Sequence, residues 1–118
     1  MLAAARHVGD EQFFVSVVEY EPDFILERDH WRCSFPSYEE YVRLPLILEN
    51  AIYSIESRWG ALVSHEDHAL VGGSREFMRY IHRSYPDWRE DISRLRSTWV
   101  NQRNAEWVEE VVSRLSGV

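Results

Sequence analysis

Strand-like and helix-like segments are segregated along this sequence instead of alternating. Residues 13–20 (FFVSVVEY) are mostly β-branched and aromatic, and Pro22 ends the run. The apolar segments 61–63 and 69–71 flank a polar string, which is typical of a β-hairpin. Helical patterns dominate the rest of the C-terminal half. This order indicates an α+β fold: a small antiparallel sheet, made of N-terminal strands and a central hairpin, packed with about four short helices.

The first helix is expected between Ser37 and Trp59. Ser37 and Glu40 match a capping box, in which the two side chains satisfy free backbone amides of the first turn. The apolar residues that follow recur with helical spacing: Leu48, Ala51, Ile52, Ile55 and Trp59. Pro45 either kinks this helix or lies in the first turn of a second helix, and Gly60 follows its last residue.

Three shorter helices are expected after the hairpin. Ser74 is placed to cap a helix over residues 75–84. Asp87 is placed to cap the next helix, which begins at Trp88, and Asn104 to cap the last one. Each of the three segments carries one apolar stripe at helical spacing, so each is expected to bury one face.

The length of 118 residues predicts a single globular domain over 1–118, with 1–12 as a frayed lead-in. Short extended pieces are expected at 24–26 and 31–33. No apolar run approaches the ~18 residues of a membrane span. The apolar stretch at the N-terminus is too short for a signal peptide. We therefore expect a soluble, cytoplasmic protein with no membrane partner.

Cofactor and metal chemistry find little support in the residues. Cys33 is the only cysteine, which excludes an internal disulfide and Cys-rich zinc sites. Its sequence neighbour His30 suggests a nucleophile with a base, but a small buried thiol is the simpler interpretation. The string 72–74 (Gly-Gly-Ser) precedes a helix without the lysine of a phosphate-binding loop, so we interpret it as a turn and a cap. No metal or cofactor is expected.

Charge is the most informative global property. The chain has 20 acidic and 13 basic residues, for a net charge of −7, and every basic residue is arginine. Seven acidic residues lie between 10 and 29: Asp10, Glu11, Glu19, Glu21, Asp23, Glu27 and Asp29. Arg28 is the one base in that segment, so seven minus one leaves −6 of the total −7 there.

This acidic segment leads to the first functional hypothesis. A cluster of like charges speeds association with an oppositely charged protein and biases the choice of partner. The chain is therefore interpreted as a small acidic protein-binding module, most specifically an inhibitor or immunity-type protein that neutralises a basic bacterial toxin or nuclease. The expected contact residues are Glu19, Glu21, Asp23, Glu27 and Asp29, with Trp31 as an aromatic anchor. Pairing of these charges within the fold is the alternative.

A second hypothesis is a small enzyme or ligand-binding domain. The string His65, Glu66, Asp67 and His68 combines two imidazoles with two carboxylates, which suits acid–base chemistry or a metal. The strand-like flanks of this string indicate a hairpin turn instead of a helix. A polar turn with no chemical role is therefore the simpler interpretation.

A third hypothesis is a regulatory module for nucleic acid or another anionic ligand. Arg75, Arg79 and Arg83 recur every fourth residue and so lie on one face of the expected helix. The overall acidity disfavours duplex binding, because phosphate contacts supply most of that affinity. A homodimer also stays open, since arginine and tryptophan are enriched at protein interfaces.

Overall fold

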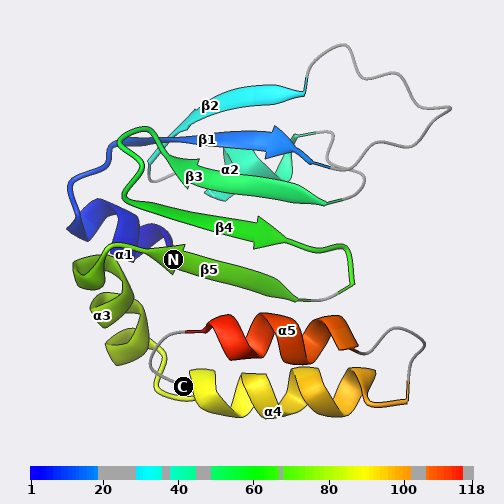
Figure 1. Ribbon diagram of the computed structural model, residues 1–118. Coiled ribbons are helices and arrows are strands. Elements are labelled where there is room, and N and C mark those ends of the chain that lie inside the picture. Colours follow the sequence, from blue (N-terminus) through cyan, green and yellow to red (C-terminus); the bar gives the residue numbers. More distant parts are fainter. Residues whose placement is uncertain (19–28, 36–37, 45–48, 67, 102–105, 116–118) are drawn as a thin grey trace, which may run out of the picture. The chain divides into compact units, whose positions relative to one another are not determined.

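The computed structural model describes residues 1–18, 29–35, 38–44, 49–66, 68–101 and 106–115 (Figure 1). In chain order its elements are α1 (Leu2–His7), β1 (Gln12–Val17), β2 (His30–Ser34), α2 (Tyr38–Val42), β3 (Asn50–Ser54), β4 (Trp59–Val63), β5 (Ala69–Gly73), α3 (Arg75–Ser84), α4 (Trp88–Trp99) and α5 (Glu106–Arg114). The α+β class is confirmed. The chain forms two compact units, Met1–Ile81 and His82–Val118, and the expectation of one domain stays a prediction.

The five strands form one antiparallel sheet in the order β2-β1-β3-β4-β5. Phe13 of β1 lies opposite Cys33 of β2 and Ser54 of β3, which fixes the register on both sides of the central strand. All neighbouring strands are antiparallel. The C-terminal ends of β1 and β4 therefore lie at the same end of the sheet as the first residues of β2, β3 and β5 (right in Figure 1). The residues that flank these strand ends, Val18, Asp29, Glu49, Ser64 and His68, therefore lie at one end of the sheet.

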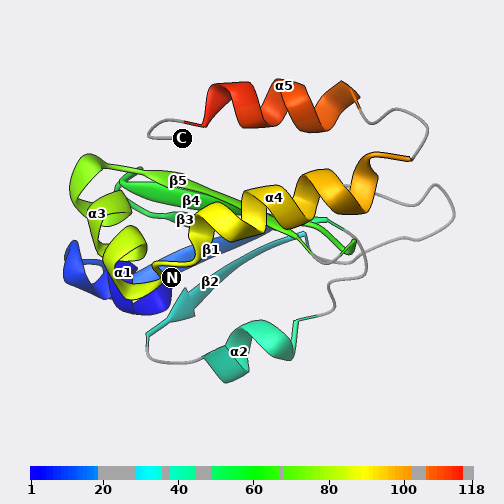
Figure 2. The same ribbon diagram turned by 90° about the horizontal axis from the view of Figure 1, so that it is seen from below.

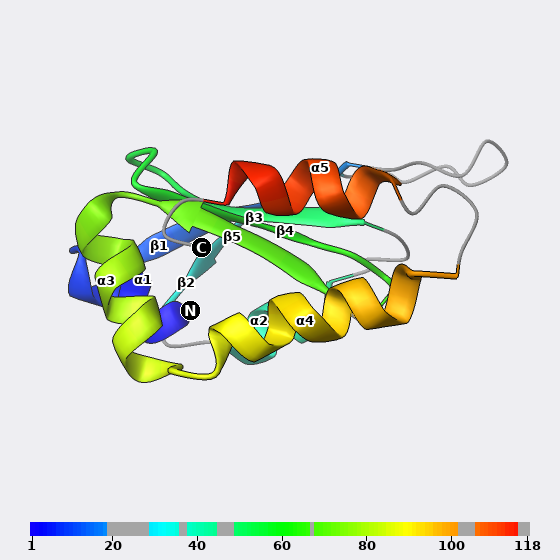
Figure 3. The same cartoon turned by 60° about the horizontal axis from the view of Figure 1, so that its bottom comes forward.

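One face of the sheet carries the hydrophobic core of the first unit. Its buried members are Ala4, Ala5, Phe13, Val15, Cys33, Ile52, Trp59 and Phe77. The ring of Phe77 from α3 stacks on Trp59 of β4, with centroids 5.5 Å apart and planes inclined by 9°. Beside this contact α1 and α3 lie next to each other in every view, with the rings of His7 and Tyr80 4.8 Å apart (Figures 1 to 3).

Several local predictions are confirmed. The strand expected at 13–20 overlaps β1, which runs from Gln12 to Val17, and the extended piece at 31–33 lies inside β2. The hairpin of β4 and β5 forms as expected, although Gly72 and Gly73 belong to β5 and not to a turn. The helix over 75–84 is confirmed together with its cap, since the Phe77 amide donates to the Ser74 hydroxyl at 3.2 Å.

The long helix expected from Ser37 to Trp59 is wrong. Among the residues of this stretch that the structure describes, only Tyr38–Val42 (α2) is helical, and 50–59 contains β3 and the start of β4. The burial of β3 alternates with Asn50, Ile52 and Ser54 inward, and two of these three residues are polar. A strand of this kind lacks the alternating hydropathy that would reveal it. The lead-in 1–12 is also more ordered than expected, because α1 buries Ala4 and Ala5 completely.

The second unit contains the helix pair α4 and α5, described here by itself. Trp99 and Trp107 meet edge to face with centroids 5.2 Å apart. The Arg96 guanidinium donates two hydrogen bonds to the Glu109 carboxylate, at 2.9 and 3.2 Å. α4 begins at Trp88 as expected, but no side-chain capping bond comes from Asp87.

The expectations for residues 24–26, Ser37, Pro45, Leu48 and Asn104 fall outside the described residues. Across the described part of the chain, no helix has both the length and the apolar character needed to cross a membrane.

Candidate functional site

The described carboxylates Asp29, Glu49 and Glu66 lie at one end of the sheet, which we call the acidic end. In the sequence, the connection 19–28 stands between β1 and β2. By sequence that connection carries Glu19, Glu21, Asp23 and Glu27, which lie outside the described residues, as does Asp67.

Glu49 organises the acidic end through one carboxylate oxygen. Its Oε1 accepts a hydrogen bond from the Ser64 hydroxyl at 2.6 Å and lies 3.6 Å from Nδ1 of His65. Its backbone carbonyl accepts from the amide of Val18 at 3.0 Å. These contacts tie the start of β3 to the end of β1 and to the turn after β4, so Glu49 has a structural role.

The turn 64–68 is held by its own hydrogen bonds. The Ser64 amide donates to the His68 carbonyl at 2.9 Å, and the Ser64 hydroxyl accepts from the Glu66 amide at 3.1 Å. Nδ1 of His68 lies 3.3 Å from the Glu66 carbonyl oxygen. His65 and Glu66 are exposed, and His68 is half-buried. The geometry is that of a closed polar turn.

The parts of the chain that the structure describes contain no set of side chains suited to bind a metal ion. No group of three or more His, Cys, Asp or Glu side chains is arranged to hold an ion there. His65 and His68 engage different partners, a Glu49 carboxylate and a backbone carbonyl.

Two of the expected contact residues are described, Asp29 directly before β2 and Trp31 within it. The Asp29 side chain is 51% exposed at the acidic end, with its Oδ1 3.3 Å from Nδ1 of His30. Trp31 lies on the core face of β2 and packs against the buried cluster. This placement argues against Trp31 as the aromatic anchor. Val18 and Leu62, which are 47% and 38% exposed, are apolar side chains near this end.

The opposite end of the sheet holds a buried carboxylate. The side chain of Asp10 is only 4% exposed. Its Oδ2 accepts hydrogen bonds from Trp59 Nε1 and from the Ser54 hydroxyl, both at 2.7 Å. Its Oδ1 lies 4.0 Å from Nη1 of Arg58, and the same nitrogen donates to the Val8 carbonyl. Asp10 is thus a buried structural anion and belongs to no exposed acidic surface.

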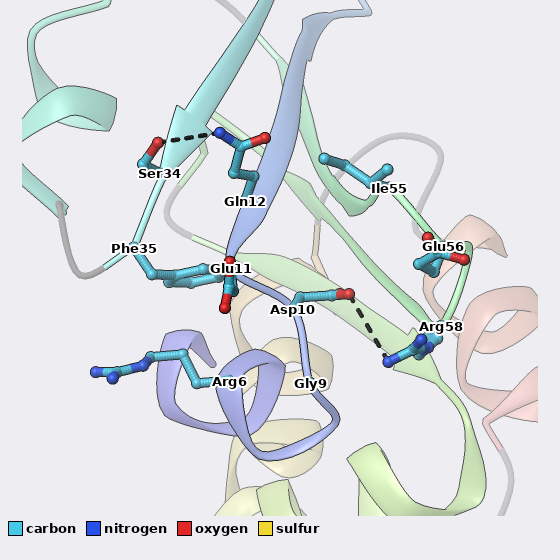
Figure 4. Close-up of a pocket in the computed structure, with 10 residues that line it drawn as sticks. All are labelled: Arg6, Gly9, Asp10, Glu11, Gln12, Ser34, Phe35, Ile55, Glu56 and Arg58. Carbon is cyan, nitrogen blue, oxygen red and sulfur yellow. Dashed lines mark hydrogen bonds and ion pairs between the residues drawn. The ribbon is translucent and has the colours of Figure 1, made fainter.

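An open groove of about 630 Å3 borders this carboxylate (Figure 4). Charged side chains of both signs line it, namely Arg6, Arg58, Asp10, Glu11 and Glu56, with Phe35 and Ile55 as apolar walls. Figure 4 shows the Asp10 carboxylate directed toward Arg58, which is occupied by that contact. The mixed charge selects no ligand class. Sequence reasoning missed this cluster, because a charge count treats buried and exposed carboxylates alike.

The remaining sequence candidates are placed as follows. Arg75, Arg79 and Arg83 are exposed on α3. Cys33 is buried, with its residue 3% exposed, which places the thiol away from an attacking substrate. The Gly-Gly-Ser string is strand followed by cap and not a phosphate cradle.

A comparison of the chain with protein-family models, curated proteins and solved structures finds no match.

Proposed function

We propose that this protein is an acidic protein-binding module, most specifically an inhibitor or immunity-type protein that neutralises a basic bacterial toxin or nuclease in the cytoplasm. The observation that supports the proposal is the unequal charge at the two ends of the sheet. Asp29, Glu49 and Glu66 mark the acidic end, and the described residues within one position of the strand ends there include no arginine. At the opposite end Arg6 and Arg58 accompany the carboxylates.

The chemistry of the target follows from this charge. An enzyme that binds phosphates has a basic site, so a protein that blocks it offers carboxylates of matching geometry. The connection 19–28 contributes four acids and one base by sequence, in addition to the described carboxylates. Val18 and Leu62 add exposed apolar surface that a partner could cover. Nucleic acid is disfavoured at this end by the same charge.

Two charge-reversal variants test the proposal. Glu21→Lys/Asp29→Lys reverses two charges of the sequence 19–29, and Glu11→Lys/Glu56→Lys makes the same change in net charge at the opposite end of the sheet. Each variant should be immobilised beside the wild-type protein, incubated with lysate of the native organism at about 50 mM and about 500 mM salt, and the retained proteins quantified. Screening acts over only a few ångström at the higher salt, so charge-driven capture should fall there.

The proposal expects a basic protein retained by wild type and by the Glu11/Glu56 variant, and reduced at least tenfold by the Glu21/Asp29 variant. Purified, that protein should lose its toxic or nuclease activity when the wild-type chain is added. If both variants retained equally less of the basic protein, its capture would depend on net charge alone and not on where the charges lie. Failure to retain any basic protein, or retention without inhibition, would contradict the proposal.

A further inference from the structure

We draw no further inference here: the strongest candidate, the sheet face opposite the hydrophobic core, where the ring of Phe14 lies against the Tyr53 ring and the Arg32 guanidinium, carries none because nothing in the structure shows what covers that face.

Discussion

Replacing Gly73 by alanine should destabilise the protein, whereas the same replacement at Gly72 should not. The two glycines are neighbours in β5 but face opposite sides of the sheet. A Cβ on Gly73 would lie 2.8 Å from the Arg58 carbonyl oxygen, 2.8 Å from Cδ1 of Phe77 and 2.9 Å from Cβ of Trp59. A Cβ on Gly72 would have no atom within 4 Å.

The magnitude follows from what must move. Phe77 is fully buried and stacked on Trp59, and the carbonyl of Arg58 accepts a hydrogen bond from the Ser74 amide. Neither group can therefore move away from the added methyl group without losing a contact. Overpacking of this kind costs about 1–3 kcal/mol. At a position with room for the methyl group, such as Gly72, replacing glycine by alanine reduces the conformational entropy of the unfolded chain. This stabilises the folded protein by about 0.4–1 kcal/mol. The two variants should therefore differ by about 2–3 kcal/mol.

Urea unfolding followed by tryptophan fluorescence and far-UV circular dichroism measures this difference. On a thermal scale it corresponds to roughly 10 °C between the two melting temperatures, at about 4 °C per kcal/mol for a domain of this size. The slope of unfolding free energy against urea should be the same for both variants. Equal stabilities would refute the reasoning, because they would mean that β5 and α3 do not approach as closely as described.

Two further perturbations have defined outcomes. Asp10→Asn should lower the free energy of unfolding by about 1–3 kcal/mol, because a neutral amide oxygen is a weaker acceptor than a carboxylate and the amide NH2 group would face the Arg58 guanidinium. In a Trp59→Phe background the loss should be smaller, and equal losses in the two backgrounds, measured by urea unfolding, would exclude the Trp59 contact. The hydrogen bond that the Tyr85 hydroxyl donates to the Asp91 carboxylate at 2.7 Å raises the pKa of Tyr85. Its contribution to stability is therefore complete below the unfolded pKa near ~10 and is lost as pH rises through the folded pKa. An ultraviolet titration should show Asp91→Asn lowering the pKa of Tyr85, and an unchanged pKa would contradict this cause.

Elements whose signal is local were predictable from the sequence. The β4–β5 hairpin is two short apolar strands joined by a polar turn, and α3 has its cap in Ser74 and its inward residue in Phe77. In each case neighbouring residues supply the bonds that define the element. The fold class followed from these elements because they come in a segregated order.

β3 was not predictable, because its polar inward residues depend on distant partners. Asn50 accepts a hydrogen bond from the Tyr41 hydroxyl at 3.0 Å, and the Ser54 hydroxyl donates to Asp10 at 2.7 Å. Without those partners, burying the Asn50 amide and the Ser54 hydroxyl would be costly. A hydropathy pattern alone therefore predicts that both side chains are exposed. The remaining apolar residues then fall by coincidence at helical spacing.

The candidate site was predictable in composition but not in arrangement. The sequence identified the carboxylates of 19–29 and the string 65–68 as separate features. Only the strand order shows that Asp29, which precedes β2, and the ends of the turn between β4 and β5 lie at one end of the sheet. Glu49, which contacts Ser64, His65 and the amide of Val18, gave no signal because it stands alone in the sequence.

The long sequence separation of the contacts made by Asp10 determines when they can form during folding. Its hydrogen bonds span 44 and 49 residues, to Ser54 and Trp59. The meander of β3, β4 and β5, in contrast, needs only short loops to close. We therefore expect the meander to form the folding nucleus and β1 to join it later through its pairing with β3. Loss of the Asp10 carboxylate should then accelerate unfolding while leaving the folding rate nearly unchanged.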